Sequence, residues 1–204
     1  TWNPENEDGG RWVWDLSLRH EAGPYTTHAF RFSQTVSEFN DLIVREAGYY
    51  LNQILSPRWT LDFVAQYLWF ETLDDDSDYE RSLFITEARF SWVLSPYIRL
   101  YPRLRFEASD YGSGTSDYLR YTVGLDGAWD LSRFTQVQLN SSYSYTDGER
   151  WDTNRFFLRL GVTHDITDTL VGRMYYEYRN KDSDQPGQTY DENVIFLNLT
   201  KYFP

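Results

Sequence analysis

The sequence has no cysteine among its 204 residues, so neither a disulfide framework nor a thiolate metal site can form. Histidine is scarce, with three residues in the chain, and they do not cluster with the spacing of a metal site. Lys181 and Lys201 are the only lysines, so arginine supplies almost all of the basic charge. We therefore expect no bound metal and no cofactor.

Long apolar runs are also missing. The mean hydropathy is −0.63, and no stretch approaches the roughly 20 apolar residues that a membrane-spanning helix needs. No basic segment followed by an apolar core begins at Thr1, so we expect a mature chain or a fragment. The formal net charge of −12 argues against nucleic acid as a partner, and against anionic headgroups as a general one.

Aromatic residues, in contrast, make up 19% of the chain, and apolar and polar residues alternate with a period of two. Over residues 59–71, apolar residues such as Leu61 and Phe63 alternate with polar ones such as Thr60 and Asp62. Similar runs occupy residues 80–94, 97–109, 117–131, 134–146, 153–166, 169–180 and 190–203, with weaker ones at 11–19, 28–37 and 43–55. Strands of ~12–14 residues are long for a soluble sheet but suit a tilted crossing of a ~30 Å hydrocarbon layer.

The connections between these runs alternate in length. Short turns lie at 56–58, 95–96, 131–133 and 165–168, and longer polar loops lie at 72–79, 110–117, 146–153 and 180–189. A barrel with one periplasmic and one extracellular rim requires this alternation, and it places the end of the last strand in the periplasm.

The two faces of the clear strands differ in charge. One face is apolar, with Lys201 as its only full charge, while the other carries many arginines and carboxylates. A charge that faces mid-bilayer lipid costs about 2–4 kcal/mol, so we expect lipid on the apolar side and an enclosed lumen on the charged side. The sequence predicts an all-β, antiparallel transmembrane up-and-down β-barrel of about 10–12 strands.

We expect residues 1–204 to form a single barrel domain. Residues 1–27 are either an incomplete first hairpin or a segment outside the barrel. Pro102 should cause a bulge or kink in its strand, because proline cannot donate a ladder hydrogen bond.

Aromatic residues fall at both ends of the expected strands, as in the interfacial belts of membrane barrels. The periplasmic belt comprises Trp59, Trp92, Trp129, Phe134 and Phe203. The extracellular belt comprises Trp69, Tyr118, Tyr145, Tyr176 and Tyr178.

Residues 193–203 alternate apolar and polar positions and end on Tyr202 and Phe203. This segment resembles the C-terminal assembly signal of bacterial outer-membrane β-barrels, from which it departs by the addition of Pro204. The resemblance implies a location in the bacterial outer membrane, with outer-membrane lipid and lipopolysaccharide as partners. The length and the arginine enrichment give a narrower resemblance to small monomeric porins for acidic oligosaccharides, which have twelve strands and arginine-lined lumens.

The candidate functional residues are arginines on the expected lumen side. The expected substrate track comprises Arg89, Arg99, Arg103, Arg105, Arg120, Arg155, Arg159 and Arg173. The expected counter-charges are Glu87, Glu107, Asp126 and Glu177, with Asp165 as a further candidate. Two interpretations remain open: a basic track that conducts anions, or a salt-bridged interior that closes the pore.

We accordingly expect a porin-like channel for small anionic solutes or acidic oligosaccharides. The alternative is a non-conducting barrel that serves as a scaffold or membrane anchor of a larger envelope assembly, such as the C-terminal barrel of an exopolysaccharide exporter. An enzyme is not expected, because His164 lacks a convincing serine partner for nucleophilic catalysis. The acidic run Asp74, Asp75, Asp76 and Asp78 is expected to be a solvated extracellular loop, with a divalent-cation site as the alternative.

Overall fold

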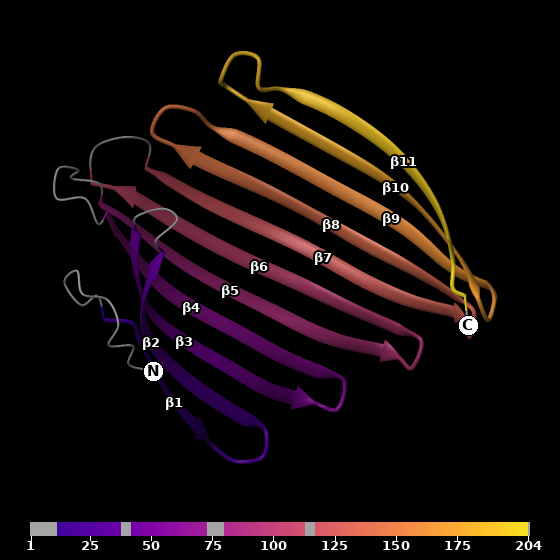
Figure 1. Ribbon diagram of the computed structural model, residues 1–204, viewed down its shortest axis with the longest axis horizontal. Coiled ribbons are helices and arrows are strands. Elements are labelled where there is room, and N and C mark those ends of the chain that lie inside the picture. The colour runs from indigo at the N-terminus through magenta and orange to yellow at the C-terminus, as the bar shows by residue number, and fades with distance from the viewer. Residues whose placement is uncertain (1–11, 38–41, 73–79, 113–116, 204) are drawn as a thin grey trace.

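The computed structural model is a single curved antiparallel sheet of eleven strands, whose spatial order is their order in the chain (Figure 1). It describes residues 12–37, 42–72, 80–112 and 117–203. The strands are β1 (Trp14–Glu21), β2 (Thr26–Ser37), β3 (Leu42–Ser56), β4 (Trp59–Thr72), β5 (Glu80–Ser95), β6 (Ile98–Tyr111), β7 (Tyr118–Ser132), β8 (Thr135–Gly148), β9 (Thr153–Thr167), β10 (Leu170–Ser183) and β11 (Tyr190–Lys201).

The prediction of an all-β, up-and-down antiparallel architecture is confirmed, and the strand number lies within the expected range. The weak period-two run at residues 11–19 corresponds to β1, which pairs with β2 along its whole length. The acidic run Asp74–Asp76 with Asp78 lies outside the described residues. Among the residues that are described, no helix is long and apolar enough to cross a lipid bilayer.

The turns after β3, β5, β7 and β9 lie at one rim of the sheet, and the strand ends that the longer connections join lie at the opposite rim (Figure 1). We call these the short-turn rim and the long-loop rim. In the short turns after β3, β5, β7 and β9, a hydroxyl accepts a hydrogen bond from the backbone amide two residues later. The pairs are Ser56 with Arg58, Ser95 with Tyr97, Ser132 with Phe134 and Thr167 with Thr169, at 3.1–3.3 Å.

A second set of hydrogen bonds joins each short turn to the nearby end of the second strand that follows it, and we call this set the turn ladder. The carbonyls of Tyr25, Arg58, Tyr97, Phe134 and Thr169 accept bonds of 2.8–2.9 Å from the amides of Ile54, Val93, Asp130, Asp165 and Tyr202, respectively. Register shifts occur beside the turns after β3, β5, β7 and β9. The short-turn rim is therefore built from one repeated joint.

No bulge forms at Pro102, where the sequence predicts a bulge or a kink. Pairing between β5 and β6 stops after Arg89–Arg103 and resumes at Trp92–Leu100, with the same register on both sides. Proline has no amide hydrogen to donate to the ladder. The pairing beside Pro102 is therefore interrupted, but the register of the two strands does not shift. On the other side, Pro102 still pairs with Leu125 of β7.

The sheet has an apolar face and a charged face, and no apolar side chain is buried among the described residues. Large apolar side chains are instead exposed, including Leu104 at 52% and Leu197 at 72%. The most buried side chains are polar, with Glu107 at 8% and Glu177 at 2%. This is the inverse of a water-soluble protein, in which apolar residues fill the interior.

The expectation that Lys201 is the only charge on the apolar face is wrong at the long-loop rim. Glu71 lies on this face and forms an ion pair of 2.6 Å with Arg45 of the neighbouring strand. Asp191, near the start of β11, shares the face of Ile195. The described strands β2–β11 have 12–16 residues, which is more than the ~9–11 residues that cross the acyl layer, so their ends extend into the polar headgroup zone.

Candidate functional site: the charged face

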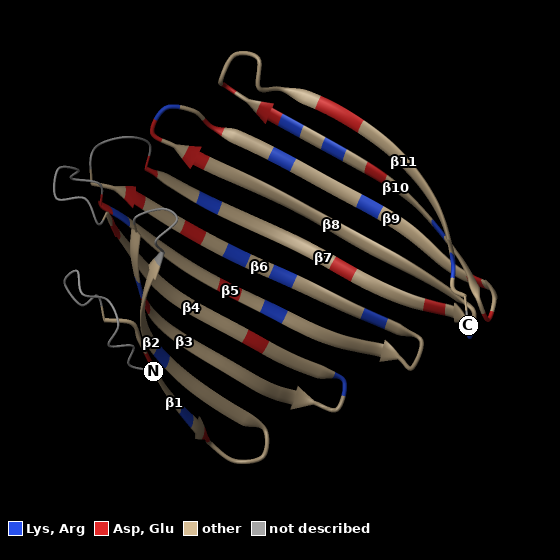
Figure 2. Ribbon diagram, in the orientation of Figure 1, with Lys and Arg blue, Asp and Glu red and all other residues tan. Residues whose placement is uncertain are grey.

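The strand register brings the predicted track arginines and their counter-charges to one face of the sheet. Arg89 lies opposite Arg103, Glu87 opposite Arg105, and Glu107 opposite Arg120, across β5, β6 and β7. Arg159 of β9 lies opposite Glu177 of β10. Figure 2 shows these charges recurring along β5–β7, β9 and β10, whereas β8 between them is charged only near the long-loop rim.

The central group of ion pairs connects β5, β6 and β7. Arg105 lies 3.3 Å from Glu87 through Nη1 and 3.3 Å from Glu107 through Nε. Arg120 Nη1 lies 3.5 Å from the same Glu107 carboxylate, and its Nε donates to Thr146 of β8. Glu87 and Glu107 therefore each form an ion pair with an arginine on this part of the face.

A second group centres on Glu177, whose side chain is almost fully buried. Arg159 Nε donates to Glu177 Oε2 at 2.7 Å, and Arg179 forms an ion pair with the other carboxylate oxygen. Arg179 also lies 3.4 Å from Glu192 of β11. The Arg159 guanidinium lies over the Tyr175 ring, 4.8 Å from its centroid. The prediction of Glu177 as a counter-charge missed Arg179, its second partner.

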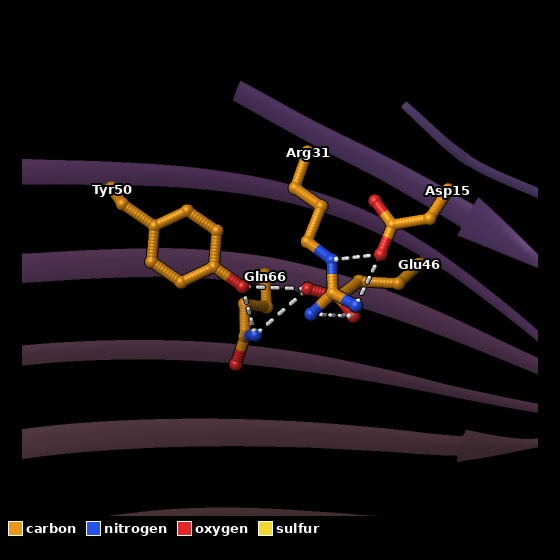
Figure 3. Close-up of polar contacts among 5 residues, drawn as sticks. All are labelled: Asp15, Arg31, Glu46, Tyr50 and Gln66. Atoms are coloured by element: carbon orange, nitrogen blue, oxygen red, sulfur yellow. Dashed lines mark hydrogen bonds and ion pairs between the residues drawn. The ribbon is translucent and has the colours of Figure 1, made fainter. Parts of the chain in front are cut away.

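A third group, on β1–β4, was not predicted from the sequence and is drawn in Figure 3. Arg31 donates to Asp15 through Nε and Nη2, at 3.1 and 2.7 Å, and lies 3.7 Å from Glu46. Tyr50 Oη donates to Glu46 at 2.6 Å, and Gln66 Nε2 donates to both Glu46 and Tyr50. In these strands the acidic and basic residues of this group occupy the alternate positions that face the charged side, and this spacing could have predicted the group. The weak alternation of apolar and polar residues in this region concealed it.

Asp126 does not serve as the ion-pair partner that the sequence predicts. It lies opposite Tyr101 and Asn140, and its carboxylate accepts a hydrogen bond of 3.2 Å from Asn140 Nδ2. The carboxylate that pairs with Arg99 is Asp130, at 3.2 Å. Asp130 also borders a recess of about 980 Å³ at the short-turn rim.

The remaining track arginines have no carboxylate partner within the described strands. They are Arg89, Arg103, Arg155 and Arg173. Asp165, the further candidate counter-charge, likewise forms no ion pair with a described residue. The charged face therefore combines ion-paired arginines and carboxylates with arginines that have no carboxylate partner among the described residues.

The expected interface aromatics that belong to strands lie on the apolar face, except Tyr118; Phe134 lies in the turn before β8, and Phe203 follows β11. Trp59 and Trp92 are opposite each other and stack with ring centroids 4.6 Å apart. Tyr118 instead lies on the charged face, opposite Ser109, with the Arg120 guanidinium 4.9 Å from its ring. The predicted aromatics Trp69, Trp129, Tyr176 and Phe203 are all exposed.

No group of three or more His, Cys, Asp or Glu side chains placed to hold a metal occurs in the described part of the chain. His164 lies on the apolar face, where its Nδ1 shares a hydrogen bond of 2.8 Å with Thr135 Oγ1. Near the first short turn, His28 Nδ1 and Tyr49 Oη share a similar bond of 2.7 Å. The absence of enzymatic activity stays a prediction.

No protein-family profile matches this sequence, and no curated protein matches it either. Several solved outer-membrane structures resemble its fold. The outer membrane channel DcaP of Acinetobacter baumannii is 10% identical, with a TM-score of 0.71 over 94% of this chain and 62% of DcaP. OmpT, an outer membrane protein of Vibrio cholerae, is 11% identical in its trimer form, with a TM-score of 0.64 over 93% of this chain and 64% of OmpT.

The ferric yersiniabactin uptake receptor FyuA of Yersinia pestis is 10% identical, with a TM-score of 0.52 over 91% of this chain and 40% of FyuA. The chain thus spans less than two thirds of the length of these proteins. At such identities the likeness shows the fold. The fold is that of a bacterial outer-membrane β-barrel, and its exposed apolar face is the side that such a barrel turns towards lipid. The fold and the exposed apolar face both agree with the predicted location in the bacterial outer membrane.

Proposed function

We propose that this protein contributes the wall of an outer-membrane channel that passes small anionic solutes, with the charged face lining the lumen. The observation that carries the proposal is the set of track arginines on this face that have no carboxylate partner among the described residues. Arginine keeps its charge at all relevant pH values and presents a planar fork that matches carboxylates and phosphates. Rings of such charges favour anions over cations in a water-filled pore.

The fold neighbours support a channel without specifying the solute. DcaP is itself an outer membrane channel, and this chain aligns with 62% of its length. The narrower resemblance to porins for acidic oligosaccharides stays a prediction, as does direct contact with lipopolysaccharide. An acidic sugar remains within the proposed class, because its carboxylate would meet the same guanidiniums.

Conductance in planar lipid bilayers tests the proposal. The full-length protein should give stepwise currents, and the reversal potential in a KCl gradient should show a preference for chloride. Replacement of Arg103 and Arg105 by glutamine should reduce that preference, because it removes positive charge from the wall. Arg58→Gln, in a short turn, is the control and should leave the preference unchanged. A folded protein that passes no current, or one that prefers potassium, would contradict the proposal.

The second candidate is a non-conducting barrel that anchors or scaffolds an envelope assembly. The ion-paired groups around Glu46, Glu107 and Glu177 favour it, because they tie neighbouring strands together and neutralise much of the wall. This candidate predicts no single-channel current and a stable protein partner after gentle detergent extraction. Purification with and without cross-linking, beside the conductance measurement, separates the two functions.

A further inference from the structure

We infer that Arg89 and Arg103 form a discrete binding site for one oxyanion, a carboxylate, phosphate or sulfate group. The two residues are direct partners across β5 and β6 and lie on the charged face. Side chains in such a pair have Cβ atoms about 5 Å apart, and like charges placed there destabilise a sheet. An anion that contacts both guanidiniums would offset this repulsion, because neither has a carboxylate within ion-pair distance among the described residues.

The neighbouring carboxylates do not contact this pair. Glu87, one pleat away on β5, is the partner of Arg105. Asp62 lies opposite Arg89 but accepts a hydrogen bond of 2.6 Å from Asn52 Nδ2. Within the described strands, neither Arg89 nor Arg103 comes within ion-pair distance of a carboxylate.

Asp126 is the other acidic side chain on this part of the face. It accepts its hydrogen bond from Asn140 of β8. Arg99 is already paired with Asp130, nearer the short-turn rim. Asp62 and Asp126 keep their negative charges, because their hydrogen bonds come from neutral amides. Neither contacts Arg89 or Arg103, whose N–H donors therefore have no carboxylate acceptor among the described residues.

The side chains of Arg89 and Arg103 lie against neutral neighbours. Arg103 lies opposite Gly124, and a Cβ atom added there would lie 3.3 Å from both Nε and Nη2 of Arg103. Arg103 Nε is buried and has no hydrogen-bond partner among the described residues. The Arg89 guanidinium lies over the ring of Tyr101, 5.3 Å from its centroid. The absent side chain at position 124 therefore makes room for Arg103 close to the backbone of β7.

An oxyanion is the ligand that fits this chemistry. Each guanidinium presents a planar fork of N–H donors that matches an oxyanion, and charge-assisted bonds of this kind are the strongest that arginine makes. An uncharged solute would leave the repulsion between the two cations in place. The inference rests on the proposed function only in that the charged face must be open to water.

Direct binding of sulfate tests the site without requiring ion flow. The full-length protein in detergent is dialysed to equilibrium against radiolabelled sulfate, at an ionic strength held constant with chloride. We expect saturable binding, and Arg89→Gln and Arg103→Gln should each weaken it about tenfold or more. Arg19→Gln removes the same charge from a distant ion pair on β1 and should change the affinity less than about twofold.

The variant Gly124→Ala tests the position of the Arg103 guanidinium separately from its charge. It keeps both arginines but displaces the Arg103 guanidinium, so sulfate affinity should fall several-fold while the net charge of the wall is unchanged. Heat-dependent migration on gels reports whether each variant is folded, and Arg89→Lys and Arg103→Lys serve in place of any glutamine variant that is not. Equal weakening by Arg19→Gln and Arg103→Gln would replace a discrete site with a diffuse positive potential and overturn the inference.

The outcome is distinguishable from that of the channel proposal. A folded protein that binds sulfate at these residues but passes no current contradicts the channel alone. A protein that conducts with a chloride preference but shows no saturable sulfate binding contradicts the two-arginine site alone.

Discussion

Gly48, in the middle of β3, illustrates how one missing side chain organises its neighbours. The Tyr50 ring folds back over this glycine to reach Glu46. A Cβ atom added at Gly48 would lie 2.8 Å from Tyr50 Cε2, 3.0 Å from its Oη and 3.1 Å from Glu46 Oε1. These distances are too short, so the Glu46–Tyr50 hydrogen bond depends on glycine at this position.

Gly48→Ala should lower the free energy of unfolding by about 1–3 kcal/mol, because the methyl group displaces Tyr50 from Glu46. Urea unfolding in lipid vesicles, followed by tryptophan fluorescence, measures the change. Gly161→Ala is the matched control, since a Cβ atom on that charged-face glycine meets nothing closer than 3.5 Å. An equal loss in both variants would show that the destabilisation does not come from the contact between Tyr50 and Glu46.

The sequence predicts which residues share a face but not which of them touch. Period two correctly places Arg99, Asp126 and Asp130 together, because parity depends only on position along the strand. The choice of Asp130 over Asp126 as the partner of Arg99 depends on cross-strand register and on side-chain conformation. Those quantities depend on other strands, so local sequence does not determine them.

At the scale of one strand, β8 combines the two environments most simply. Its charged-face positions near the middle are uncharged and polar, as at Gln138 and Asn140, while Leu139 between them is on the apolar face. Substitutions at neighbouring positions of this strand therefore probe the two opposite faces of the sheet.

Leu139→Arg should lower the free energy of unfolding by about 2 kcal/mol or more, because it exposes a guanidinium to the acyl chains. Gln138→Arg, one residue away, should change it by less than about 0.5 kcal/mol, because Gln138 lies opposite the uncharged Ala128 and Gly161. The same vesicle-based unfolding measurement compares the two variants. If Gln138→Arg is the more damaging substitution, the assignment of the faces is reversed.

Strand boundaries follow from the sequence where turn residues punctuate the pattern. The run at 80–94 becomes Glu80–Ser95, and the run at 153–166 becomes Thr153–Thr167. The short turns fix these ends through serine and threonine hydroxyls. At the long-loop rim the strands extend further than expected, because polar residues can continue the strand pairing beyond the lipid. For example, β10 continues to Ser183 rather than ending near residue 180.

At the scale of the whole molecule, the absence of cysteine allows single labels to be placed anywhere in the chain. Nitroxide labels at successive positions 136–143 of β8 should show alternating accessibility in vesicles. Odd positions should be reached by oxygen dissolved in lipid, and even positions by a water-soluble nickel reagent, because the two faces meet different solvents. Power-saturation electron paramagnetic resonance measures both. Accessibility without a period of two would rule out a wall between lipid and water.

The turn ladder also bears on how such a wall can change in size over evolution. Because each hairpin is fastened to the next by the same carbonyl-to-amide joint, duplication or deletion of one hairpin leaves every remaining joint intact. The number of strands around the barrel can then change in steps of two, while the charged face, the apolar face and the two rims keep their places. Barrels of different girth can therefore descend from one ancestral repeat without any change in how neighbouring hairpins meet.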